Sequence, residues 1–329
     1  MSLALPWLAP LTERLQAARR LGRFPPALLI QDQPGAGGNW LADFAARTAL
    51  CESEQAPCGE CRSCQRFASN QHPDLLRVGL EEDSRQIRIE QIRELTAGLV
   101  LTSHGHGVTV AILTPADAMN THAANALLKT LEEPRAGVSL ILVTQVPSRL
   151  PATIRSRCQK LVVRRPTLTE ALAWLRQERG AGDWEAILEV LGPAPLAAAE
   201  QDPAAFTRLR RESWEALRDL RGPQPPAIPP LAERWAKAPD LPLRLLCLEN
   251  WLTLLLDAHC GSRAAAAKLP TGAHLQGGAS VINMASLFQH LERLHDIRRL
   301  QGTPVNMALA LEQLLWQWRR GPDQPRGLG

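Results

Sequence analysis

The sequence predicts an α/β domain with a parallel sheet, followed by a part made of helices alone. Short apolar runs alternate with helical patterns in the first half of the chain, and such runs are typical of parallel strands buried on both faces. After about residue 164 the strand pattern stops and apolar residues recur at helical spacing. This order indicates a sheet covered by helices on both faces, with helical domains behind it.

Five apolar runs are the expected strands, at residues 27–30, 75–78, 108–113, 140–144 and 161–163. Before the first of them, residues 3–21 carry leucines at a period of 3.6 with arginines between them, which predicts an amphipathic helix. After the first strand comes the glycine-rich segment 33–38, and then a helical pattern through Ala49. The beginning of the chain therefore predicts a helix and then a strand–loop–helix unit.

Capping residues mark the first helices of the second half. Thr167 and Glu170 form a capping box before the apolar residues 171–175, and Asp183 is the expected N-cap of a helix at 184–191. The segment 222–230 holds five prolines and predicts a linker between helices. Strongly apolar helices are expected at 243–256, 281–300 and 306–318. Packing within the chain and a subunit interface both remain open as explanations of their apolar faces.

Composition bounds the class of protein. A chain of 329 residues is too long for one ordinary core and predicts two or three domains. Its 45% hydrophobic and 21% charged residues are typical of globular proteins, and no apolar run is long enough to span a membrane. Residues 1–10 lack the features of an export signal, so we expect a cytoplasmic protein. A net charge of +4 is too small for a dedicated electrostatic DNA binder.

The cysteines predict a structural zinc site. Four of them fall at Cys51, Cys58, Cys61 and Cys64 in a loop that contains Gly, Pro and Ser. Four thiolates complete a tetrahedral zinc site and leave no open position for a catalytic water. The remaining cysteines are isolated and are expected to be small apolar core residues: Cys158, Cys247 and Cys260.

The glycine-rich loop stands where a nucleotide-binding P-loop would lie, but it lacks that chemistry. A working P-loop reads G-x-x-x-x-G-K-[ST], because the lysine neutralises phosphate charge and the hydroxyl holds magnesium. Here Asp32 stands at the first glycine and should repel a phosphate. The lysine and hydroxyl positions hold Gly38 and Asn39, beside the glycines Gly35 and Gly37.

The strand at 108–113 has lost the matching acidic residues. A Walker B strand ends in acids that hold magnesium and activate water, whereas Thr114 and Pro115 follow this one. Two degenerate motifs at matched strand ends indicate a nucleotide-binding fold that has lost hydrolysis.

Two further strings resemble a known family. Residues 125–134 read N-A-L-L-K-T-L-E-E-P, and Ser156-Arg157-Cys158 reads S-R-C. Both are similar to the AAA+ clamp-loader subunits of bacterial DNA polymerase III, in which the S-R-C motif carries an arginine finger. The resemblance covers the whole chain, most weakly after residue 210. The gamma/tau members keep the P-loop lysine and the Walker B acids, so the departures favour the delta-prime type. Pro195 stands near the position of the family's sensor-2 arginine, which removes a third contact to nucleotide.

The resemblance implies an architecture and a role. It places an AAA+ α/β domain with the cysteine module 51–64 at residues 1–163, a helical lid at 164–208, a helical collar at 209–322 and a disordered tail at 323–329. The expected protein is a subunit of the polymerase holoenzyme, a nucleotidyltransferase complex, with no ATPase activity of its own. It joins a heteropentamer with gamma/tau and delta subunits that loads the sliding clamp on primed DNA. Arg157 reaches the ATP of the adjacent gamma/tau subunit; an ordinary surface ion pair is its alternative role.

Two other functions fit the sequence less well. An active ATPase of the gamma/tau type is contradicted by Gly38 and Thr114. A zinc-dependent DNA-binding module would need basic residues concentrated around the cysteines, where only Arg62 and Arg66 stand.

Overall fold

The computed structural model describes residues 4–82, 84–99, 107–269, 284–301, 303 and 305–320. The chain forms two compact units: Met1–Gly180 with Pro193–Glu200, and Ala181–Gly192 with Gln201–Gly329. The three-domain division expected from the sequence stays a prediction, and the expected disordered tail lies outside the described residues. None of the described helices is long and apolar enough to cross a membrane.

The first unit is built on a sheet of five parallel strands in the order β2-β3-β4-β1-β5. All five expected strands are confirmed, with bounds that differ by no more than a few residues. Leu28, Leu29 and Ile30 in the first strand are fully buried, as a strand covered on both faces requires. The strands are β1 Ala27–Gln31, β2 Leu75–Val78, β3 Thr109–Leu113, β4 Val138–Thr144 and β5 Gln159–Val162.

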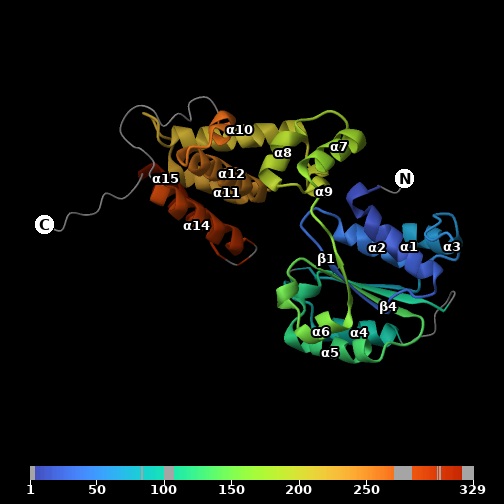
Figure 1. Ribbon diagram of the computed structural model, residues 1–329. Coiled ribbons are helices and arrows are strands. Elements are labelled where there is room, and N and C mark those ends of the chain that lie inside the picture. Colours follow the sequence, from blue (N-terminus) through green and yellow to red (C-terminus); the bar gives the residue numbers. More distant parts are fainter. Residues whose placement is uncertain are drawn as a thin grey trace. The chain divides into compact units, whose positions relative to one another are not determined.

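Helices cover both faces of this sheet (Figure 1). One face carries α1 (Ala9–Arg20), α2 (Gly38–Leu50) and α3 (Arg62–Ala68), with the 3-10 turn η1 (Pro6–Leu8) before α1. The other face carries α4 (Ile89–Gly98), α5 (Thr121–Glu132) and α6 (Ala152–Arg157). Helices α7 (Leu168–Arg179) and α9 (Pro195–Ala199) complete the unit. The capping box of Thr167 and Glu170 at the start of α7 is confirmed.

The strand register brings the carboxyl ends of three strands to one edge. Gln31 of β1 pairs with Thr144 of β4, and Leu113 of β3 pairs with Leu142 of β4. Asp32 and Thr114 directly follow two of these ends. Open α/β sheets bind their ligands beyond the carboxyl ends of the strands, so the two degenerate motifs lie at the expected place for a nucleotide.

The second unit is all helical. Asp183 caps its first helix by accepting a hydrogen bond from the Ala186 N–H, as expected. Buried tryptophans lie in its core. The ring centroids of Trp214 and Trp251 are 5.3 Å apart, and Trp235 and Trp318 are also buried. The helices are α8 Trp184–Leu191, α10 Pro203–Asp219, α11 Ile228–Lys237, α12 Leu241–His259, α13 Arg263–Lys268, α14 Met284–Leu300 and α15 Met307–Arg320.

Two expectations are wrong in this unit. The proline-rich linker is shorter than predicted, because Pro229 and Pro230 lie in the first turn of α11, where the missing N–H costs no helical hydrogen bond. Cys260 is exposed at the end of α12 and is no core residue, unlike the buried Cys158 and Cys247. For the helix expected at 281–300, residues 281–283 lie outside the description.

Candidate functional site

In the degenerate loop, residues 32–39, the carboxylate of Asp32 accepts hydrogen bonds from backbone N–H groups of the loop itself. Asp32 Oδ1 accepts a hydrogen bond of 2.8 Å from the Gly38 N–H, at the N-terminus of α2, and the Gln33 N–H also donates to this side chain. Burial raises the pKa of Asp32, although these hydrogen bonds lower it. In a P-loop the corresponding N–H groups bind phosphate. Here an anion from within the chain already holds them.

Gly38 is also required by close packing. A Cβ atom on Gly38 would lie 2.3 Å from Cγ of Asp32. No lysine can therefore stand at this position while Asp32 keeps its place.

The two residues at the magnesium position bind each other. Thr114 Oγ1 donates a hydrogen bond of 2.9 Å to Asn39 Oδ1, which joins the first turn of α2 to the end of β3. The structure thus brings together two residues that are 75 positions apart and that the sequence identified separately. The side chains of Asn39, Thr114 and the following Pro115 are uncharged, so none of these three residues offers a carboxylate to a magnesium ion.

Asp117 is an acidic residue at this edge that the sequence analysis did not single out. It lies in the 3-10 turn η2 (Ala116–Ala118) after β3. Its Oδ1 accepts hydrogen bonds from Thr144 Oγ1 at 2.7 Å and from the Gln145 N–H at 3.1 Å. The carboxylate therefore ties β3 to the end of β4. Its position four residues after Leu113, the last residue of β3, was the available signal.

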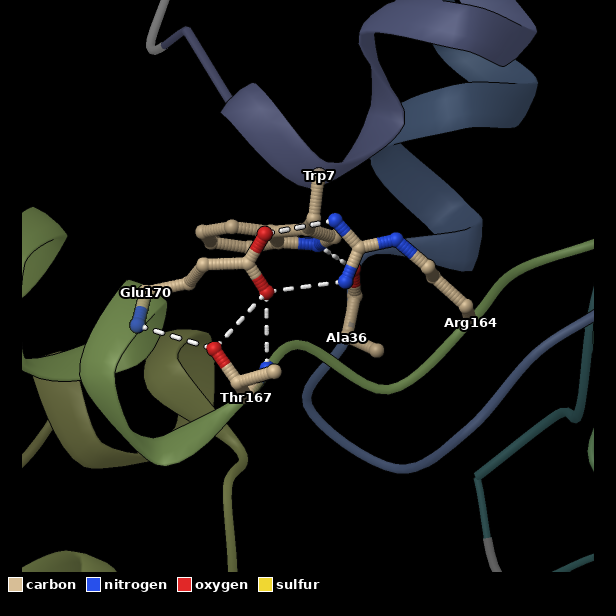
Figure 2. Close-up of polar contacts among 5 residues, drawn as sticks. All are labelled: Trp7, Ala36, Arg164, Thr167 and Glu170. Atoms are coloured by element: carbon tan, nitrogen blue, oxygen red, sulfur yellow. Dashed lines mark hydrogen bonds and ion pairs between the residues drawn. The ribbon is translucent and has the colours of Figure 1, made fainter.

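The chain's own side chains cover the outer side of the loop. Trp7 is buried, and its Nε1 donates a hydrogen bond of 2.7 Å to the Ala36 carbonyl (Figure 2). A Cβ atom on Gly37 would lie 2.8 Å from a methyl group of Leu5 and 3.4 Å from one of Leu196. The loop therefore faces apolar groups of η1 and α9.

Helix α9 also touches the loop through its backbone. The Leu196 N–H donates a hydrogen bond of 3.2 Å to the Gly35 carbonyl. A Cβ atom on Gly35 would lie 2.6 Å from Cβ of Ala194, and Gly35 has a φ of +72°. Only glycine tolerates both the close approach and this backbone conformation. Pro195, at the sensor-2 position, begins α9 and brings no positive charge.

An ion pair stiffens the segment between β5 and α7. Arg164 donates two hydrogen bonds, of 2.8 and 2.6 Å, to the carboxylate of Glu170, which also accepts from the Thr167 N–H (Figure 2). These contacts, that with Arg164 first, lower the pKa of Glu170 to about 2. The pair is exposed, so it organises the segment more than it stabilises the fold.

The four expected metal ligands are brought together. The sulfur atoms of Cys51, Cys58, Cys61 and Cys64 all lie within 4.8 Å of one another. Backbone N–H groups point at the sulfurs, as from Cys61 to Cys58 Sγ at 3.3 Å and from Cys64 to Cys61 Sγ at 3.4 Å. Such bonds favour thiolates, and the first of them is the main reason that the pKa of Cys58 is lowered to about 7. Four thiolates at this spacing fit a tetrahedral metal ion.

The cysteine cluster is attached to the sheet domain from two sides. In α1, Arg19 Nη2 donates a hydrogen bond of 3.3 Å to the Cys51 carbonyl, and Gln16 Nε2 donates one of 3.1 Å to the Ala56 carbonyl. Ser63 Oγ donates 2.7 Å to the Leu50 carbonyl at the end of α2. These contacts fix the loop ends, so a metal would hold a short segment with almost no apolar core of its own.

Arg157 lies at the end of α6 with 36% of its side chain exposed. Its Nη2 lies 2.8 Å from Glu132 Oε1, and its Nη1 donates a hydrogen bond of 3.0 Å to the Thr153 carbonyl. The guanidinium is thus accessible and held by two acceptors of its own chain. Its role toward a neighbouring subunit stays a prediction.

The sequence is similar to known subunits of DNA polymerase III. A family model described as "DNA polymerase III, delta subunit" matches residues 8–167. The DNA polymerase III subunit delta′ of Pseudomonas aeruginosa is 33% identical over an alignment of 309 positions, which covers 90% of this chain and 92% of that protein. The subunit delta′ of Escherichia coli is 36% identical over 65% of this chain and 64% of its own length. The tau subunit of E. coli is 31% identical over 42% of this chain and 21% of its own length.

A solved structure shares the fold. A gamma subunit-related protein of DNA polymerase III from Thermotoga maritima matches with a TM-score of 0.52 at 17% identity, over 93% of this chain and 99% of that one. The α/β sheet, the helical C-terminal part and the sequence relatives agree with the architecture expected for an AAA+ clamp-loader subunit. The chain belongs to the family of DNA polymerase III delta′ subunits.

Proposed function

We propose that this chain is the non-hydrolysing delta′ subunit of a clamp loader, which joins gamma/tau and delta subunits and loads the sliding clamp on primed DNA. The observation that carries the non-hydrolysing half is the hydrogen bond from the Gly38 N–H to the Asp32 carboxylate. A phosphate would have to displace this anion from the loop, and it would find no lysine at position 38 and no acidic residue at positions 114 and 115 to hold magnesium.

The remaining contacts of the degenerate loop support the same proposal. Trp7 and Leu196 lie against the loop from outside, and Asn39 and Thr114 bind each other where magnesium would be held. ATP binding would therefore require the loss of packing as well as of hydrogen bonds. An active ATPase of the gamma/tau type is disfavoured by the same contacts.

Arg157 is the residue that we propose acts on the ATP of a neighbouring gamma/tau subunit. A guanidinium suits the charge that develops on a transferred phosphoryl group, and arginine fingers act on ATP that a neighbouring subunit holds. In this proposal Arg157 approaches the γ-phosphate in the adjacent gamma/tau subunit, while its own chain binds no nucleotide. Its exposed fraction of 36% leaves it accessible to such a neighbour.

Zinc is the proposed metal of the four-cysteine cluster. A site of four thiolates has no position open for substrate or water, so its role is to fold the segment 51–64. The direct DNA-binding alternative gains nothing near the cluster, where Arg62 is exposed and Arg66 half-buried.

Calorimetry on the isolated chain with Mg-ATP tests the non-hydrolysing half. We expect no binding in the micromolar range and no phosphate release, with a gamma/tau subunit as the positive control. Micromolar affinity would refute the proposal. For the assembly, native mass spectrometry of a mixture with gamma/tau and delta subunits should detect this chain in the complex, and its absence would contradict the proposed role.

A further inference from the structure

Glu132 holds the guanidinium of Arg157 in a defined place. Glu132 is the last residue of α5, and Arg157 is the last residue of α6. Glu132 Oε1 lies 2.8 Å from Nη2 of Arg157, while the Thr153 carbonyl accepts from Nη1 at 3.0 Å. Glu132 thus holds Nη2 by an ion pair, and the backbone carbonyl of Thr153 holds Nη1 by a hydrogen bond.

The backbones that carry these groups are fixed. Leu127 and Leu131 of α5 and Ile154 of α6 are buried in the same hydrophobic core. The side chains of Glu132 and Arg157 themselves are 49% and 36% exposed. The ion pair is therefore accessible to solvent and contributes little to stability, but it stands on a rigid support.

We propose that Glu132 is a positioning residue for Arg157, which keeps the guanidinium oriented toward the ATP of a neighbouring subunit. The inference rests on the proposed function of Arg157. A free arginine side chain has many rotamers, and their restriction opposes each hydrogen bond that it forms on reaching a phosphate. Held by Glu132 and Thr153, the side chain has already lost this freedom.

The pairing leaves donors for the phosphate. A guanidinium carries five N–H groups in a planar fork; the Thr153 carbonyl accepts one of them from Nη1, and Glu132 forms an ion pair with Nη2. Arg157 can therefore bind phosphate oxygens without leaving Glu132. A group held in this way acts without reorganisation when the reaction occurs, which is the main source of electrostatic catalysis.

The test uses the assembled clamp loader. Gamma/tau subunits whose own S-R-C arginine is replaced by alanine leave Arg157 of this chain as the finger to be measured. Single-turnover ATP hydrolysis is then recorded with wild-type chain, Glu132→Ala and Glu132→Gln. We expect the rate at saturating ATP to fall by up to about a hundredfold in Glu132→Ala, as for a misplaced catalytic group, and by less in Glu132→Gln, which keeps a hydrogen-bond acceptor. The ATP concentration for half-maximal rate should not change, because Glu132 does not touch the nucleotide site.

Glu133 provides a matched control. It is the next acidic residue of the same string and is exposed, and it forms no ion pair with Arg157 among the described residues. Glu133→Ala should leave the rate unchanged. Circular dichroism and native mass spectrometry establish that each variant folds and assembles. If Glu132→Ala does not fold or assemble, Glu132→Gln, which keeps the size and polarity of the side chain, is used for the rate measurement.

A double-mutant cycle separates positioning from a general structural effect. In the Arg157→Ala background, Glu132→Ala should have no further effect. A wild-type rate in Glu132→Ala and Glu132→Gln, a faster rate, or a loss that adds to that of Arg157→Ala would overturn the inference while the proposed role of Arg157 stands. No loss in Arg157→Ala itself would overturn the proposed role of Arg157 and the inference with it.

Discussion

Replacement of Trp7 by alanine should destabilise the unit that contains the degenerate loop. The indole is 1% exposed, its Nε1 donates to the Ala36 carbonyl at 2.7 Å, and its ring centroid lies 5.6 Å from that of Trp174. Removal of a fully buried aromatic side chain costs about 3–5 kcal/mol in the free energy of unfolding. Trp7→Phe keeps most of the ring and loses the hydrogen bond, which we expect to cost about 1–3 kcal/mol.

Urea unfolding followed by far-UV circular dichroism measures this difference. With a slope at the upper end of the usual 1–3 kcal/mol/M, the alanine variant should lower the transition midpoint of this unit by roughly 1–2 M. Trp316→Ala is the matched control, because Trp316 is 37% exposed, and it should cost below about 1 kcal/mol. Equal midpoints for Trp7→Ala and Trp316→Ala would refute the role assigned to Trp7. A gain of ATP binding in Trp7→Ala would refute the blocking role of Asp32, which this variant leaves in place.

Four further outcomes are expected. The chain purified with reductant and without chelators should contain one zinc ion by elemental analysis, and Cys58→Ser should lower that content; zinc-free native protein would contradict the four-thiolate site. Gly38→Lys should not produce ATPase activity, because its side chain meets Asp32, and a measurable rate of phosphate release would show that the loop is not blocked. Arg157→Ala should leave zinc content and assembly unchanged but nearly abolish ATP hydrolysis at the neighbouring site, where an arginine finger contributes about 10³–10⁵ in rate. Arg157→Lys should not restore hydrolysis. A rate of clamp loading that is unchanged in Arg157→Ala would show that Arg157 is an ordinary surface residue. Arg164 holds the pKa of Glu170 at about 2, below its ordinary value of 4.5. Their pair should therefore stabilise the fold above pH 4.5 and lose that effect as the pH falls toward 2. Glu170→Gln should flatten the dependence of the unfolding free energy on pH in this range, and a dependence identical to that of the wild type would contradict the assignment.

The secondary structure followed from local patterns. The five strands and the helices at the capping residues Thr167 and Asp183 were predicted because periodicity and capping act between residues close in sequence. The two errors have local causes as well. Prolines that break a helix interior fit its first turn, so the proline-rich segment predicted too long a linker before α11. An isolated cysteine carries no pattern that separates a core position from a helix end, and Cys260 lies at such an end.

The degenerate nucleotide site was recognised in the sequence as a set of missing groups. The absence of a lysine at Gly38 and of acids at Thr114 is a property of residue types, and it needs no structure. What replaces those groups is a different question. The pairing of Asn39 with Thr114 and the carboxylate of Asp32 on the Gly38 N–H depend on how β1, β3 and α2 meet.

The sequence alone determined the family, the strand–loop–helix order, the four clustered cysteines and the loss of nucleotide chemistry, because each is written in short strings or in residue types at fixed spacing. Tertiary structure decided which distant segments cover the loop and hold the arginine. Trp7 reaches Ala36 across 29 positions, Leu196 lies against Gly37, and Glu132 pairs with Arg157. Such contacts form only when helices from separate parts of the chain pack on one sheet, and no local periodicity encodes which side chains then meet.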